Sequence, residues 1–289
     1  MLFDELIHAI EMSGANVYDL ALYTDQEGIR SHRFQSCSNA QDSYSVAKAF
    51  VVTAIGMLWD ENKLQLTNRF ASLFADELPK DADLGWQVAT VEHAITHRLG
   101  FDENFLDIDV DDVESIIDQD WLQLVFRHPL KHIPGTHNQY TDAAYYLLSR
   151  TISKIAGENL DSFLMRRLFR PMKFHEVAWS CCPMNYPIGA SGLYVSSADM
   201  VKLGALYLNH GMWQGKRYLS EAWVRKCIGS EFEFHPIISH GELIGKGGMY
   251  GQVVLFSPVN RFALAWHAHE SADHGKKLLY TLEQLLCVS

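Results

Sequence analysis

The sequence predicts an α+β fold in which strands from both chain ends form one antiparallel sheet and a helical lobe is inserted between them. Alternating apolar patterns, typical of strands, occur at residues 17–23 and 29–34, and again at 250–256 and 262–267. The patterns between these two regions are mostly helical. Because an apolar sheet face has to be covered, we expect terminal helices to flank the sheet and a cleft to form beside the inserted lobe.

The predicted elements follow one another without a repeat, a low-complexity tract or a linker. We therefore expect a single domain over residues 1–289. Its sheet lobe would comprise about 1–44 plus 235–289, and its all-helical lobe about 45–234. The expected helices are residues 3–10, 47–62, 110–126, 142–156, 160–169, 197–209, 221–227 and 272–286.

Composition argues against several classes of protein. A net charge of −11 over 289 residues disfavours nucleic acid as the main partner, because phosphate binding needs a basic face. Residues 1–10 lack the basic start and the unbroken apolar stretch of a secretory signal, so we expect a cytoplasmic protein. The apolar residues 49–59 are too few to span a bilayer. Five cysteines without C-x-x-C spacing suggest free thiols.

Ser45-Val46-Ala47-Lys48 is an S-x-x-K motif at the start of an apolar helix. Residues three apart share one face of a helix, so the Lys48 amine can reach the Ser45 hydroxyl. A serine needs a nearby base to become nucleophilic, and a lysine serves when burial favours its neutral form. By itself the motif is weak, because about one such match is expected by chance in a chain of this composition.

Further segments accompany this motif in a fixed order. Tyr140-Thr141-Asp142 follows a Pro-Gly turn, and residues 246–249 read Lys-Gly-Gly-Met before an apolar strand. With the residues around Ser45, these segments resemble the serine β-lactamase-related family, which includes penicillin-binding proteins, D-amino-acid peptidases, family VIII esterases and class C β-lactamases. Residues 90–100 and 191–217 also resemble segments of this family. The resemblance implies a β-lactamase/transpeptidase-like form of the α+β fold.

The resemblance also implies catalytic roles. Ser45 would attack a carbonyl group and form an acyl-enzyme, Lys48 would take its proton, and Tyr140 would pass a proton to the leaving group. Lys246 would bias the two bases toward their base forms and could pair with a substrate carboxylate. No metal or organic cofactor is implied, and the expected partner is a small-molecule acyl substrate. The sequence indicates no oligomeric state.

The binding side of the site departs from the family pattern. The backbone N–H groups of the nucleophile and of Met249, next to Gly248, would form the oxyanion hole. Asp142 stands where the family has Asn, and an ionised Asp can only accept hydrogen bonds. Gly247 replaces a Thr whose hydroxyl helps to hold a substrate carboxylate. These features predict an acyl-serine hydrolase of a small ester, amide or D-amino-acid peptide, or alternatively a penicillin-binding or catalytically weakened ligand-binding module.

Other patterns resemble metal sites. Residues 107–111 begin like a calcium loop, but Asp112 occupies the position that requires glycine. His93 and His97 lie four apart, in the order E-H-x-x-x-H instead of the H-E-x-x-H of zinc proteases. Residues 267, 269 and 274 add three more histidines near a strand. A solvated loop and packing or capping histidines are the favoured interpretations.

Overall fold

The computed structural model describes residues 2–230, 232–237, 243–271, 278–280 and 283–285. The chain divides into two compact units, which are considered separately below. The first comprises Met1–Ala49, Phe169–Ala178 and Leu193–Ser289, and the second comprises Phe50–Leu168 and Trp179–Gly192. Within the described residues, no helix is both long enough and apolar enough to cross a membrane.

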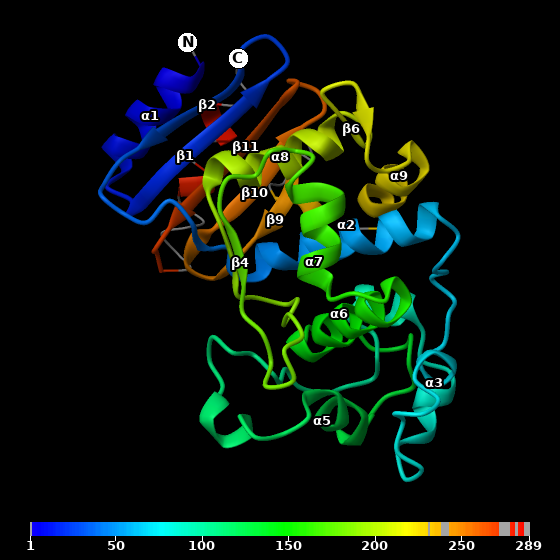
Figure 1. Ribbon diagram of the computed structural model, residues 1–289. Coiled ribbons are helices and arrows are strands. Elements are labelled where there is room, and N and C mark those ends of the chain that lie inside the picture. Colours follow the sequence, from blue (N-terminus) through cyan, green and yellow to red (C-terminus); the bar gives the residue numbers. More distant parts are fainter. Residues whose placement is uncertain (1, 231, 238–242, 272–277, 281–282, 286–289) are drawn as a thin grey trace. The chain divides into compact units, whose positions relative to one another are not determined.

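A six-stranded sheet forms the centre of the first unit, in the order β2-β1-β11-β10-β9-β8 (Figure 1). Strands from the two chain ends are neighbours in it, because β1 pairs antiparallel with β11. This confirms the predicted pairing of the chain ends. The strands are β1 (Val17–Thr24), β2 (Gly28–Arg33), β8 (His235–Pro236), β9 (Ile244–Gly247), β10 (Val253–Ser257) and β11 (Phe262–Ala268).

A helix covers each face of this sheet (Figure 1). On one face, α1 (Leu2–Ser13) buries its apolar side chains against β1, β10 and β11. On the other face, α8 (Ser197–Leu208) packs so closely that a β-carbon on Gly204 would lie 3.3 Å from Val254 Cγ2. The two neighbours of Val254 in β10 belong to the α1 core. Successive side chains of β10 therefore lie on opposite faces of the sheet, as expected of a strand that is buried on both faces.

The unit around the sheet extends further than we expected from the sequence. Residues 193–234, which we expected in the helical lobe, group with the sheet. The physical reason is that α8 packs against β1, β10 and β11. The same segment contains the hairpin β6 (Met212–Trp213) and β7 (Lys216–Arg217), followed by α9 (Glu221–Gly229).

A small sheet supports the start of α2 (Ala47–Asp60). It has the order β3-β5-β4, with β3 (Gln41–Asp42), β5 (Leu193–Val195) and β4 (Val177–Trp179). The sequence patterns did not indicate these short strands, nor did they indicate β9. Strands of two to four residues are too short to show a clear alternation.

The second unit is a helical lobe built around α6 (Asp142–Ala156), which has the predicted bounds. This helix packs against α4 (Val91–Ile95), α5 (Trp121–Arg127) and α7 (Leu160–Leu164). It ends at Gly157, whose φ of 71° is the left-handed conformation common after a helix. The lobe also contains α3 (Phe70–Leu73).

Two predicted helices are interrupted. Residues 110–126 contain a short 3₁₀ turn, η3 (Val113–Ile116), and then α5. A new helix starts because Asp120 Oδ1 accepts the Leu122 N–H at 2.9 Å, which is an N-cap. Residues 160–169 change from α-helical to π-helical at Met165. The predicted closing helix lies largely outside the described residues, although 278–280 and 283–285 are helical.

Candidate active site

Ser45 lies in a short 3₁₀ turn, η1 (Tyr44–Val46), which leads directly into α2. Hydrogen bonds hold this turn from both sides. Asp42 Oδ1 accepts the Tyr44 N–H at 2.8 Å. The Ser43 N–H donates to the carbonyl of the first residue of β5, also at 2.8 Å. The small sheet therefore fixes the backbone around Ser45 before the helix begins.

Lys48 lies in the first turn of α2, and its Nζ is 2.9 Å from Ser45 Oγ. The lysine side chain is completely buried, whereas the serine is half-buried. A partly accessible hydroxyl in contact with a buried amine is the arrangement that a serine nucleophile and its base require. The S-x-x-K spacing thus brings the two groups together.

Two tyrosines beside the nucleophile have a left-handed backbone. Tyr44 has a φ of 46° and Tyr250 a φ of 59°. Such a conformation costs a non-glycine residue on the order of 1–3 kcal/mol, so the surroundings must hold it in place. The two rings pack edge to face at 5.3 Å, and Tyr250 also stacks on His269 at 4.4 Å. This packing connects η1 to the segment that follows β9.

At Gly248 that segment lies directly against the chain that leads into η1. A β-carbon at Gly248 would lie 2.6 Å from the Ser43 carbonyl oxygen and 3.2 Å from Tyr44 Cβ. A side chain would therefore push the two segments apart. Met249, the next residue, begins the 3₁₀ turn η5 (Met249–Gly251). Its main chain is consequently held beside η1.

Lys246 forms an ion pair with Glu233. Both side chains are almost fully buried, with 8% of Lys246 and 2% of Glu233 exposed. In the β9–β10 register Lys246 is opposite Val254, so the lysine lies on the α8 face of the sheet. No motif marked Glu233 in the sequence, because the segment 230–234 matches neither a helical nor a strand pattern.

Tyr140 and Asp142 belong to the helical unit, where His97 holds the segment that contains them. The Tyr140 ring stacks on the His97 imidazole at 4.4 Å, and His97 Nδ1 accepts the Thr141 N–H at 3.2 Å. The Asp142 N–H donates to Asn104 Oδ1 at 2.8 Å, and the Asp142 side chain is 3% exposed. His97 thus holds the segment Tyr140-Thr141-Asp142 in place, through contacts that its place in the sequence did not reveal.

The predicted site residues therefore form two groups. Ser45, Lys48, Lys246, Gly248 and Met249 lie within the sheet unit, and contacts inside that unit connect the nucleophile turn to the segment after β9. Tyr140 and Asp142 lie within the helical unit. The positioning residues that were missed, His97 and Asn104, act through backbone hydrogen bonds that only the folded chain reveals.

The calcium-like segment uses its carboxylates to hold its own loop. Asp107 Oδ1 accepts the Asp109 N–H at 3.1 Å, and Asp111 Oδ2 accepts the Asp107 N–H at 2.8 Å. Asp109 Oδ2 accepts the Ser191 hydroxyl at 2.5 Å. Within the described ranges, only one group of three possible ligand atoms is compact enough to hold a metal ion. It comprises Asp102, Glu103 and His128. The segment 107–111 is not part of that group.

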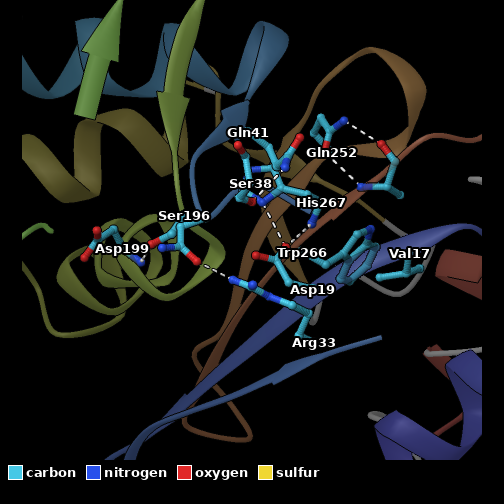
Figure 2. A network of polar contacts seen from close by, with 12 residues as sticks. Val17, Asp19, Arg33, Ser38, Gln41, Ser196, Asp199, Gln252, Trp266 and His267 are labelled. Carbon is cyan, nitrogen blue, oxygen red and sulfur yellow. Dashed lines mark hydrogen bonds and ion pairs between the residues drawn. The ribbon is translucent and has the colours of Figure 1, made fainter. Parts of the chain in front are cut away.

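His93, His267 and His269 make packing or capping contacts, as predicted. His93 Nδ1 accepts the Thr90 N–H at 3.3 Å within a capping box at the start of α4. Figure 2 shows Asp19 and His267 pointing toward one another between β1 and β11. Their Oδ1 and Nδ1 atoms are 3.0 Å apart, and His267 is fully buried. His269 stacks on Tyr250, and His274 lies outside the described residues.

The cysteines that the structure describes, Cys37, Cys181, Cys182 and Cys227, are free thiols, as predicted. Burial raises the pKa of the Cys37 and Cys181 thiols. A raised pKa reduces the fraction of reactive thiolate. This disfavours a nucleophilic role for the two cysteines. Cys287 lies outside the described residues.

Comparisons with known proteins identify the family and the fold. The profile of the family described as Beta-lactamase matches residues 13–285. A curated protein of Escherichia coli (strain K12), named "Putative D-alanyl-D-alanine carboxypeptidase", is 28% identical over 127 residues, which are 41% of this chain. The match covers 29% of that relative's length.

Two solved structures share the fold. The "Putative 6-aminohexanoate-dimer hydrolase from Bacillus anthracis" has a TM-score of 0.80 and 14% identity, over 96% of this chain and 80% of that one. The β-lactamase/D-alanine carboxypeptidase from Pseudomonas syringae has a TM-score of 0.70 and 16% identity, over 98% and 97% of the two chains. At these identities the likeness establishes the fold and leaves the reaction to be argued from the residues.

Proposed function

Because the chain belongs to the Beta-lactamase family, we propose that it is an acyl-serine hydrolase with Ser45 as nucleophile and Lys48 as base. The observation that carries this proposal is the distance of 2.9 Å between Lys48 Nζ and Ser45 Oγ. A base must lie within hydrogen-bond reach of the proton that it removes. The burial of the lysine supports the proposal further, since it excludes bulk water from the amine.

In the acylation step, Ser45 Oγ attacks the carbonyl carbon of the substrate while its proton moves to the Lys48 amine. Negative charge develops on the carbonyl oxygen. The backbone N–H groups of Ser45 and Met249 are the donors proposed to stabilise it. The close approach at Gly248 supports this assignment, because it holds the Met249 main chain beside the nucleophile turn.

The tetrahedral intermediate then breaks its bond to the leaving group, which needs a proton. We assign its delivery to the Tyr140 hydroxyl. The stacking of the Tyr140 ring on His97 supports this role, because it fixes the ring while 39% of the residue stays exposed. A water molecule then attacks the acyl-enzyme carbonyl and gives one proton to the Tyr140 oxygen. The bond to Ser45 Oγ breaks as Oγ takes back the proton held by Lys48, which releases the acid and restores both residues.

Small esters, amides and D-amino-acid peptides are the proposed substrates. The name of the E. coli relative points to D-aminoacyl peptides. The alcohol of an ester leaves more readily than the amine of an amide, so ester hydrolysis depends less on a proton donor. A panel of p-nitrophenyl esters, D-aminoacyl anilides and nitrocefin therefore spans the proposed classes.

Labelling with a fluorophosphonate probe tests the nucleophile, because this probe reacts with activated serines. We expect labelling of the wild-type protein and none of Ser45→Ala. Lys48→Ala should be labelled far more slowly while keeping the wild-type circular dichroism spectrum. Equal labelling of wild type and Ser45→Ala would refute the proposal, and so would full activity in folded Lys48→Ala.

The alternative is a penicillin-binding module that acylates but does not turn over. Asp142 favours it, because an ionised carboxylate lacks the donor that an Asn offers to a substrate carbonyl. A fluorescent penicillin separates the two functions. Stable Ser45-dependent labelling without ester hydrolysis would favour the module, and turnover of any ester or amide would favour the hydrolase.

A further inference from the structure

The cation of Lys246 is already matched by a carboxylate of the protein itself. Its partner Glu233 is 2% exposed, and the ion pair lies on the α8 face of the sheet, which also holds Val254. A buried lysine and a buried glutamate in contact form a neutral pair. The positive charge of Lys246 is therefore already neutralised before any substrate anion binds.

The chain around Glu233 keeps this carboxylate in place. Its neighbours Phe232 and Phe234 are buried, and Phe234 packs on Tyr207 of α8 at 4.1 Å and on Phe256 of β10 at 5.9 Å. The following strand, β8, pairs with β9 directly beside Lys246. The packing of the neighbouring aromatic residues and the β8–β9 pairing hold the Glu233 segment in place, so its carboxylate stays buried.

Lys246 belongs to β9, a strand that contacts η1, the turn that carries Ser45. Lys246 is two residues before Gly248, whose main chain lies against the nucleophile turn. Within the proposed site, an acyl group on Ser45 whose carbonyl oxygen faces Met249 would lie beside this end of β9, because β9 contacts η1. A carboxylate on that acyl group would lie near a pair whose charges already cancel, so no net attraction would offset the cost of removing it from water. The buried negative charge of Glu233 would oppose its binding further. Gly247 adds no side-chain hydroxyl that would compensate.

We infer that this site selects acyl donors without a carboxylate near the scissile bond, namely neutral or amine-bearing esters and amides, and that Glu233 sets this preference. The inference rests on the proposed hydrolase function. It narrows the substrate class of the same site, and Glu233 acts through Lys246 as a specificity-determining residue.

Two esters with acyl chains of equal length test the inference. They are p-nitrophenyl pentanoate and mono-p-nitrophenyl glutarate, which differ in a terminal carboxylate, with Ser45→Ala as the blank for spontaneous hydrolysis. We expect the wild-type kcat/KM to favour the pentanoate by roughly tenfold or more. Glu233→Gln should reduce this ratio by a similar factor, mainly through a lower KM for the glutarate, because Lys246 then lacks its internal anion.

Asp199→Asn is the matched control, since Asp199 and Lys202 form a second buried ion pair in the same unit. It should retain the wild-type ratio even if the protein becomes less stable. If the wild-type kcat/KM values for the two esters are nearly equal, the inference is wrong and no variant is needed to show it. It is also wrong if folded Glu233→Gln keeps the wild-type ratio. If neither ester is hydrolysed in a Ser45-dependent manner, the hydrolase proposal fails and this inference fails with it.

Discussion

The main chain of Gly248 lies directly against the Ser43 carbonyl, close enough that a β-carbon on Gly248 would be 2.6 Å from that oxygen. Real β-carbons do not approach a carbonyl oxygen so closely. The contact therefore requires a glycine and joins the segment after β9 to the segment that carries the nucleophile. Both segments belong to the sheet unit, so this part of the site is built within one compact body.

Gly248→Ala should lower kcat/KM for a p-nitrophenyl ester by roughly 100-fold, because a displacement of about 1 Å in a catalytic segment has an effect of that size. Gly247→Ala is the control, since the nearest atom to a β-carbon there is 3.8 Å away. It should retain most of the activity. Comparable activities of the two folded variants would show that the close approach at Gly248 is not needed for catalysis.

His97→Ala should slow ester turnover by roughly 10- to 100-fold, because it removes the ring on which Tyr140 stacks and the acceptor of the Thr141 N–H. Fluorophosphonate labelling of Ser45 should fall much less, because fluoride leaves without needing a proton from Tyr140. Tyr140→Phe should show the same split between the two assays.

A structural defect alone would lower turnover and labelling of His97→Ala in parallel, and that result would contradict the positioning role. His132→Ala provides the control for this experiment. His132 is exposed and stacks on His137 at 4.0 Å, so its removal should affect neither assay.

The sequence patterns predicted the architecture where they were long and regular. The four long terminal strands appear within three residues of their expected bounds, and α6 has the expected bounds, because periodicity over five or more residues is a strong signal. The lobe boundary could not be predicted in this way. The pattern of α8 is helical in either lobe, and only its packing against β1, β10 and β11 assigns it to the sheet unit.

The candidate site also contains both residues that the sequence made predictable and residues that it did not. Ser45 and Lys48 were predictable because helical spacing alone brings them into contact. Glu233 was not, since its partner Lys246 is distant in sequence and the pairing follows from the position of β8 beside β9. His97 was visible as a histidine on a helical pattern, but its contacts with Tyr140 and Thr141 arise from tertiary structure.

Lys202→Met should lower the free energy of unfolding by about 3–5 kcal/mol, because it leaves a buried carboxylate without its cation. Lys202 Nζ donates to Asp199 Oδ1 at 2.6 Å, and Asp199 is completely buried. Urea unfolding measures the change. Arg225→Met should change stability by no more than about 0.5 kcal/mol, because Arg225 and Glu221 form an exposed pair. Equal losses in both variants would contradict this account.

The stability of the helical unit should fall as the pH drops below about 6.5, the ordinary histidine value. Burial lowers the pKa of His93 in the folded chain, and its Nδ1 must stay unprotonated to accept the Thr90 N–H. The unfolded chain therefore takes up this proton at a higher pH than the folded chain does. The contribution of His93 is fully present above the unfolded pKa and is lost as the pH falls through that value toward the folded pKa.

His93→Gln isolates this contribution, because a glutamine at the third helical position can complete the capping box without titrating. Urea unfolding of both proteins between about pH 7.5 and 5.5 should show a smaller loss of stability in the variant. Burial also lowers the pKa of His128, so part of the slope should persist in His93→Gln. Identical slopes in the two proteins would mean that His93 is protonated equally easily in the folded and unfolded chains, and the capping role of its Nδ1 would then be wrong.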